Sequence, residues 1–242
     1  MGRVLKSGWL AGIAAALLAG ASARAAIILD NFVGPQTAFV PSGGSNPSSV
    51  PVGATAPGAI GGARLLTATR TSGSGIVYAD VNGGLLSHGS GPADAGIATV
   101  SYDGNNDTTF DPSTGLGGID LTGGGTNNGL KFLYRADFGG AVVSVTLYSG
   151  ASNFSTGSFV AGATGFDPNP YAAGNILFSS MVAGGGTGAN PASITGIKLT
   201  IDGSSVPALD LQLQSVVSDV VPEPASVGLM LVGASLLARR RK

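Results

Sequence analysis

The chain contains no cysteine, which excludes disulfide bonds, zinc–thiolate sites and thiol catalysis. Charged residues make up 10% of the 242 residues, against about a quarter in ordinary globular proteins. Histidine and glutamate each occur once, so two side chains that often serve as general acids or bases are scarce. The single tryptophan, Trp9, lies in an apolar segment near the N-terminus. The fold must therefore be stabilised by the burial of apolar surface.

Glycine is the most abundant feature of the composition, with 41 residues. Apolar and polar residues alternate clearly in four segments of the second half, which predicts half-buried strands at 130–138, 141–148, 197–202 and 209–214. Gly139–Gly140 separates the first two segments and Gly203–Ser205 the last two, so each pair is expected to form a hairpin. Weaker alternation predicts further strands at 27–32, 64–70, 75–81, 97–102, 159–161 and 176–181.

About ten short strands joined by turn signals predict an all-β fold, a two-sheet antiparallel β-sandwich or jelly roll. Residues 27–221 are enough for one such domain. The Pro-, Gly- and Ser-rich segment 41–62 is expected to be a flexible surface loop or extended linker, and 184–191 a second loop.

The first 26 residues are typical of a secretory signal peptide. Arg3 and Lys6 precede an apolar run at 9–21, and small residues follow it. Cleavage after Ala23, Ala25 or Ala26 fits equally well, and a retained N-terminal anchor is the alternative. The pattern predicts export through the Sec translocon and removal of residues 1–26 by signal peptidase.

The last 21 residues, 222–242, combine three features. Pro222 and Pro224 fix an extended backbone around Glu223. The uncharged run 226–238 suits a short hydrophobic membrane helix, about 20 Å long against a hydrocarbon core of about 30 Å. The basic cluster that ends the chain is expected to stay on the cytoplasmic side; it consists of Arg239, Arg240, Arg241 and Lys242. A terminal core helix is the alternative.

This tail resembles the PEP-CTERM sorting signal of exopolysaccharide-producing Gram-negative bacteria. The resemblance rests on Pro222, Glu223 and Pro224, the apolar run and the basic end, and covers less than a tenth of the chain. It implies recognition and removal of the tail by exosortase, an integral-membrane transpeptidase-like protease that releases or re-anchors its substrate. The implied route is an inner-membrane-anchored precursor, then the cell surface or the extracellular space. The resemblance concerns this route and leaves the function of the domain open.

Residues 27–221 contain five basic and twelve acidic residues, a net charge of −7. Nucleic-acid binding needs clustered Lys and Arg to neutralise phosphates, so this domain is not expected to bind nucleic acid. The densest polar cluster is 102–111. Asp103, Asn105 and Asp107 have the i, i+2, i+4 spacing of oxygen ligands for Ca²⁺, although Thr114 stands where an EF-hand has its closing glutamate. The alternative is a turn that these side chains stabilise through their own backbone.

Three functions remain open at this stage. A non-enzymatic structural role in contact with extracellular polysaccharide is the leading hypothesis, and a lectin-like module that binds carbohydrate, with or without calcium, is the alternative. Tyr78, Tyr102, Tyr134, Tyr148 and Tyr171 are the tyrosines available to stack on sugars. A glycoside hydrolase would need two facing carboxylates, which the scattered aspartates do not identify. His88 is expected to be a solvated loop residue without a catalytic role.

Overall fold

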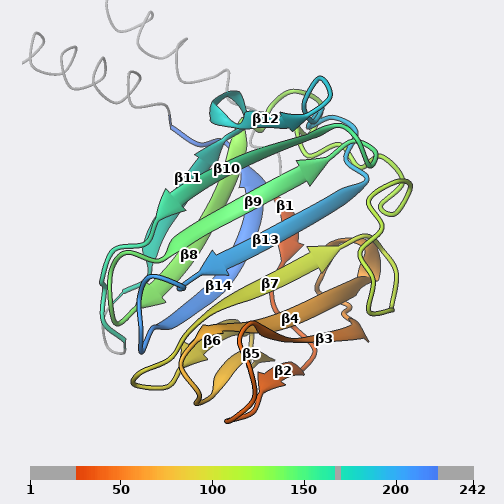
Figure 1. The fold of residues 1–242 in the computed structure, drawn as a ribbon. Helices are drawn as coiled ribbons and strands as arrows, with labels where there is room; N and C mark the ends of the chain where they lie inside the picture. The colour runs from red at the N-terminus through yellow and green to blue at the C-terminus, as the bar shows by residue number, and fades with distance from the viewer. Residues whose placement is uncertain (1–25, 167–169, 223–242) are drawn as a thin grey trace, which may run out of the picture.

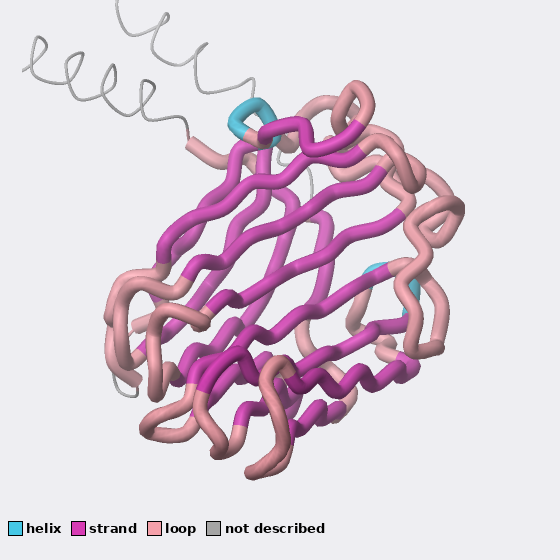
Figure 2. Tube along the Cα trace, viewed as in Figure 1, coloured by secondary structure: helices cyan, strands magenta, loops and turns pink. Residues whose placement is uncertain are grey.

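A computed structural model describes residues 26–166 and 170–222, and this part of the chain is a β-sandwich of fourteen strands (Figures 1 and 2). The strands are β1 (Ile27–Asp30), β2 (Gln36–Val40), β3 (Ser48–Thr55), β4 (Ala63–Ser72), β5 (Val77–Asn82), β6 (Leu85–Ser90), β7 (Ala95–Tyr102), β8 (Gly129–Ala136), β9 (Val142–Tyr148), β10 (Phe154–Val160), β11 (Ala172–Leu177), β12 (Val182–Gly185), β13 (Gly196–Asp202) and β14 (Asp210–Asp219). Two short 3₁₀ turns, η1 (Ile60–Gly62) and η2 (Phe178–Ser180), complete the elements.

Each sheet has seven strands, and neighbouring strands are antiparallel. Sheet A has the order β11-β8-β14-β6-β5-β2, and β1 also pairs with β14. Sheet B has the order β12-β10-β9-β13-β7-β4-β3. The all-β fold with two antiparallel sheets is thus confirmed.

The core lies between the two sheets and is formed by the alternation that the sequence displays. In β13, Ile197, Leu199 and Ile201 are almost fully buried, while the residues between them are partly exposed. In β14, Leu211 and Leu213 are fully buried in the same way. Inward-facing side chains of both sheets meet in one continuous apolar cluster, as expected for a sandwich whose strands each bury one face.

Both predicted hairpins are wrong. The link at Gly139–Gly140 leads from β8 in sheet A to β9 in sheet B, and residues 203–209 lead from β13 in sheet B to β14 in sheet A. Alternation shows which residues face the core. It cannot show whether the next strand lies beside the first or opposite it, because a crossing to the other sheet also turns apolar side chains inward.

The prediction of a flexible loop at 41–62 is also wrong for the centre of that segment, because β3 occupies Ser48–Thr55. This strand pairs with β4 along its whole length and forms the edge of sheet B. Pro51 lies opposite Thr67 in that pairing. A proline lacks the N–H that an inner strand must donate, but an edge strand tolerates it. Val50 and Val52 pack against the core. They are the two apolar residues of a short apolar–polar alternation in this strand.

Candidate functional site

The loop 103–111, predicted to bind calcium, is organised by its own carboxylates. The side chain of Asp103 is buried, and its two oxygens accept hydrogen bonds from the backbone N–H groups of Asn105 (3.0 Å) and Asp111 (2.7 Å). Asp107 is exposed and accepts from the N–H (2.9 Å) and the hydroxyl (3.1 Å) of Thr109. The contacts of Asp103 with Asn105 and of Asp107 with the N–H of Thr109 are those of Asx turns, in which a side-chain oxygen replaces a backbone acceptor. The contact of Asp103 with Asp111 closes the loop over eight residues.

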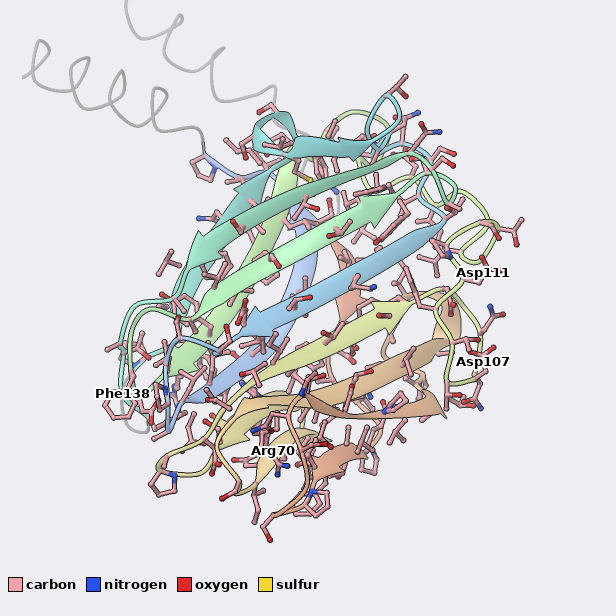
Figure 3. All side chains as sticks on the ribbon, viewed as in Figure 1. Arg70, Asp107, Asp111 and Phe138 are labelled. Carbon is pink, nitrogen blue, oxygen red and sulfur yellow. The ribbon has the colours of Figure 1, made fainter. Side chains whose placement is uncertain are left out.

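The three candidate calcium ligands differ in their burial. Asp103 is buried, whereas Asn105 and Asp107 are exposed, and Asp107 and Asp111 both lie in the loops beyond the end of β7 (Figure 3). Within 26–166 and 170–222, no three carboxylate or histidine side chains are grouped to hold a metal ion. Calcium binding through Asp103, Asn105 and Asp107 stays a prediction of the sequence.

The sorting tail lies almost entirely outside the described residues. Pro222 is described and exposed, while Glu223, Pro224, the apolar run 226–238 and the basic cluster 239–242 are not described. The signal peptide falls outside as well, apart from Ala26. No helix among the described residues is long and apolar enough to cross a membrane.

The expectation of a solvated His88 is wrong. His88 lies in β6 with 1% of its surface exposed, and its Nδ1 is 3.0 Å from the carbonyl oxygen of Tyr78. Burial lowers the pKa of the imidazole, and the hydrogen bond with the carbonyl of Tyr78 opposes that shift only in part. A neutral histidine on the core side of a strand is a packing residue. The six-residue strand around His88 lacks a long apolar alternation, so the pattern does not predict that His88 is buried.

On the outer face of sheet A, a row of aromatic and polar residues runs across the strands. The cross-strand partners are Phe39 in β2, Tyr78 in β5, Gly89 in β6 and Asp210 in β14. Asp137, just after β8, continues the row: its Oδ1 accepts from the N–H of Asp210 (2.9 Å), and its own N–H donates to the carbonyl of Asp210 (3.1 Å). Residues far apart in the chain thus become neighbours.

A second row runs parallel to the first, two residues along each strand. The partners in it are Thr37, Asp80, Ser87, Gln212 and Arg135. The guanidinium of Arg135 stacks over the ring of Tyr171, 4.1 Å from its centroid, a cation–π contact. This row is polar along its length and ends on an aromatic ring.

Tyr78 and Asp210 meet above Gly89, which has no side chain to separate them. The Tyr78 hydroxyl donates to Oδ1 of Asp210 at 3.4 Å. Burial raises the pKa of Asp210, and the negative charge of Asp137 adds to this effect. Burial and the charge of Asp210 likewise raise the pKa of Tyr78. The raised pKa of Tyr78 keeps its hydroxyl protonated at neutral pH, so the phenol is a hydrogen-bond donor to Oδ1 of Asp210.

These residues line a pocket of ≈ 200 Å³. Its walls are formed by Tyr78, Ser87, His88, Phe166, Asp210, Leu211 and Gln212. Phe166 comes from the segment after β10, which is tied down where the N–H groups of Thr164 and Gly165 donate to the carbonyl of Ala136 (2.9 and 3.0 Å). Two aromatic side chains thus face a carboxylate, an amide and a hydroxyl, a set suited to a neutral polar ligand with an apolar face.

Sequence reasoning did not find this site. The sequence offers Tyr78 as one of the tyrosines available to stack on sugars, but it places Asp210 and Gln212 only in the predicted half-buried strand 209–214. The partners Tyr78 and Asp210 are separated by 132 positions, and only the order of β5, β6 and β14 in sheet A brings them together. A tyrosine and an aspartate on the outward side of their strands were the available signal.

No family model and no curated protein matches the chain. Among solved structures, a family 11 carbohydrate-binding module of the cellulosomal cellulase Lic26A-Cel5E of Clostridium thermocellum is similar at 11% identity and a TM-score of 0.39, covering 84% of this chain and 99% of the module. A family 29 carbohydrate-binding module is similar at 10% identity and a TM-score of 0.33, covering 77% of this chain and 89% of the module. Similarity this low establishes neither a shared family nor a shared ligand.

Proposed function

We propose that the sandwich is a non-catalytic carbohydrate-binding domain that takes a saccharide on the outer face of sheet A. The observation that carries the proposal is the pocket in which Tyr78 and Phe166 face Asp210 and Gln212. An aromatic ring offers an apolar face to the C–H groups of a pyranose. Carboxylate and amide groups at the rim accept and donate hydrogen bonds to its hydroxyl groups.

The chemistry of the pocket favours binding over hydrolysis. Glycoside hydrolases use two carboxyl groups on opposite sides of the scissile bond, about 5 to 9.5 Å apart. Among the residues that line this pocket, Asp210 supplies the carboxylate. Asp137, a neighbouring carboxylate whose charge acts on Asp210, uses one of its oxygens to accept from the N–H groups of Phe138 (2.7 Å) and Asp210 (2.9 Å). It serves as a turn acceptor beside the pocket.

The binding proposal is tested with a glycan array, followed by calorimetric titration of the glycans that bind. We expect Tyr78→Ala and Gln212→Ala each to weaken binding by about tenfold or more, corresponding to about 1.4 kcal/mol or more. Tyr148→Ala is the matched control, because Tyr148 is also a half-buried tyrosine but lies in β9 of sheet B. Binding that survives Tyr78→Ala and Gln212→Ala, or no binding to any glycan, would contradict the proposal.

We propose in addition that the protein is exported and sorted to the cell surface, where it associates with extracellular polysaccharide. The support is the sequence of both ends: the signal-like residues 1–26 and the tail 222–242 with its Pro-Glu-Pro motif. The implied processing partners are signal peptidase and an exosortase-type membrane protease. Cell fractionation and mass spectrometry of the chain termini, for the wild type and Glu223→Gln, test this route. A tail that persists equally in both, in cells that carry the protease, would contradict it.

A matrix role without specific saccharide binding is the second candidate. It predicts retention in extracellular polymer even when the pocket is altered. Extraction of the polymer fraction from cells that produce Tyr78→Ala separates the two candidates. Loss of retention supports binding through sheet A, and unchanged retention supports the structural role.

A further inference from the structure

The two ends of the sandwich domain leave the fold side by side. β1, the first strand, pairs antiparallel with the last strand, β14, and Ile27 lies opposite Ser218. Figure 1 shows β1 beside the C-terminal half of β14. The residue that follows the expected signal peptide is therefore fixed next to the residues that precede the expected sorting tail.

The last described residues are held firmly to the fold. Asn128 binds the backbone of Val221 twice: its Nδ2 donates to the Val221 carbonyl (2.9 Å), and its Oδ1 accepts from the Val221 N–H (2.6 Å). The side chain of Val221 is buried, with 3% of its surface exposed. Just before it, Asp219 forms an ion pair with Lys131 at 2.7 Å. The ordered fold thus extends to the residue directly before Pro222.

This attachment leaves little chain between the domain and the apolar run. Residues 222–225 are the only ones between Val221 and the start of the run at Ser226. The five residue steps from Val221 to Ser226 span at most about 18 Å. When 226–238 lies in a membrane, the end of the sandwich around Val221 must stand within that distance of the membrane surface or of a protein embedded in it.

We define the exit end as the surface around Val221. It consists of the loop 121–128, η2, the start of β1 and the end of β14. The N–H of Phe178 in η2 donates to the carbonyl of Asn128 (2.9 Å), which joins η2 to this surface. Two apolar side chains of the exit end are about half exposed, Ile28 at 53% and Val220 at 54%. Ile28 lies in β1 and Val220 directly follows β14, the strands that carry the two ends of the domain, so both side chains are exposed to a protein that contacts the domain beside the short tether.

We propose that the exit end is a docking surface for the integral-membrane protein that processes the tail, so that this partner contacts the folded domain as well as the Pro-Glu-Pro motif. The inference rests on the proposed sorting function. The Asn128 clamp, the two hydrogen bonds between Asn128 and Val221, acts as a positioning device: it holds the residue directly before the motif against the domain, which spares the partner part of the entropy of ordering the chain.

The test measures tail removal in cells that carry the processing protein, by pulse labelling and mass spectrometry of the full chain. Inserting about twelve Gly and Ser residues between Val221 and Pro222 lengthens the four-residue tether about fourfold. The effective concentration of the docking surface at the processing protein then falls as about the −3/2 power of tether length, so we expect processing to slow by up to about eightfold. The same insertion between the exposed Ser204 and Ser205, in the connection that precedes β14 and so lies at the opposite end of that strand, is the matched control and should leave the rate unchanged.

Asn128→Ala should also slow tail removal. Because Asn128→Ala also lowers stability, its control is Val143→Ala, a substitution of a buried residue in sheet B. The two variants are compared under conditions in which their melting temperatures fall by a similar amount. Processing that is slowed by Asn128→Ala but not by Val143→Ala supports the clamp. Processing unchanged by both the tether insertion and Asn128→Ala, while Glu223→Gln still blocks it, overturns the docking surface and leaves sorting intact. Normal processing of Glu223→Gln overturns the sorting proposal itself.

Discussion

The ring of Tyr78 occupies the space where a side chain of Gly89, its partner on the neighbouring strand, would lie. A Cβ atom at position 89 would come within 2.4 Å of both Cζ and the hydroxyl oxygen of Tyr78, and within 2.5 Å of Oδ1 of Asp210. The glycine is therefore required by the position of the ring. The backbone of Gly89 is not in the left-handed region, so alanine can be tolerated there once the ring moves.

We predict that Gly89→Ala displaces Tyr78 and weakens saccharide binding by about tenfold, with a stability loss of about 1–3 kcal/mol from the added crowding. Titration calorimetry and urea unfolding measure the two effects. Gly157→Ala is the matched control, because its Cβ would lie 2.4 Å from Ile176, at a position in β10 of sheet B. It should lose comparable stability and keep its affinity. Equal affinities for the wild type and Gly89→Ala would contradict the role of the ring.

The raised pKa of Asp210 predicts a defined pH dependence of stability. Because burial raises the pKa of this carboxyl above its ordinary value of 3.8, the folded state binds the proton more tightly than the unfolded chain. The contribution of Asp210 to stability is therefore full below the unfolded pKa and is lost as the pH rises through the folded pKa. The contribution of Asp219 to stability depends on pH in the opposite direction, since its hydrogen bond with Lys131 lowers its pKa.

We expect Asp210→Asn to remove the loss of stability that Asp210 causes as the pH rises. Melting temperatures of the wild type and the variant, measured between about pH 4 and pH 6, should diverge in favour of the variant as the pH rises. Asp80→Asn, on the same face in β5, is the control. A difference between wild type and Asp210→Asn that does not change with pH would show that the carboxyl is not perturbed.

The buried ion pair of Arg64 and Asp30 predicts a large effect of single substitutions. Nη1 of Arg64 lies 2.7 Å from Oδ2 of Asp30, and both side chains are at most 1% exposed. Tyr102 also donates to Asp30 (3.0 Å), and Gln36 accepts from Nε of Arg64 (2.9 Å). Removing one partner leaves the other charge buried without compensation.

We predict that Asp30→Ala lowers the free energy of unfolding by about 3–5 kcal/mol. The double variant Asp30→Ala/Arg64→Met should lose less than the sum of the two single variants, because neither charge is then left alone. Urea unfolding of the four proteins completes the cycle. Strict additivity would show that the two groups do not interact.

The fold was predictable where alternation extends over a whole strand. β8, β9 and β13 bury every second residue along most of their length, and β14 does so up to the register shift after Leu213, so their apolar periodicity identified them. β2 and β3 went unrecognised because they are short or rich in Ser, Pro and Gly, and their pairing with β5 and β4 stabilises them as edge strands. Such strands are determined by their neighbours more than by their own sequence.

The candidate site was less predictable than the fold, for a related reason. Its residues come from β5, β6 and β14 and from the segment that ends at Phe166. Their meeting depends on strand order, and the wrong assignment of the β13–β14 link as a hairpin would have placed Asp210 in sheet B. The residues predicted to bind calcium, by contrast, are close together in sequence, so their spacing is visible without the fold. In the structure its Asp103 accepts two backbone amides of its own loop.

The final prediction concerns that loop. Asp103→Ala removes a buried acceptor from the N–H groups of Asn105 and Asp111, and we expect a stability loss of about 1–3 kcal/mol. Asp103→Asn can keep one of the two contacts through its side-chain oxygen and should lose less. If Asp103 acts as a turn acceptor alone, millimolar Ca²⁺ leaves the melting temperature of the wild type unchanged, and this is the outcome we expect. A calcium-dependent rise in the wild type that is absent from Asp103→Ala would instead assign Asp103, Asn105 and Asp107 to a metal site.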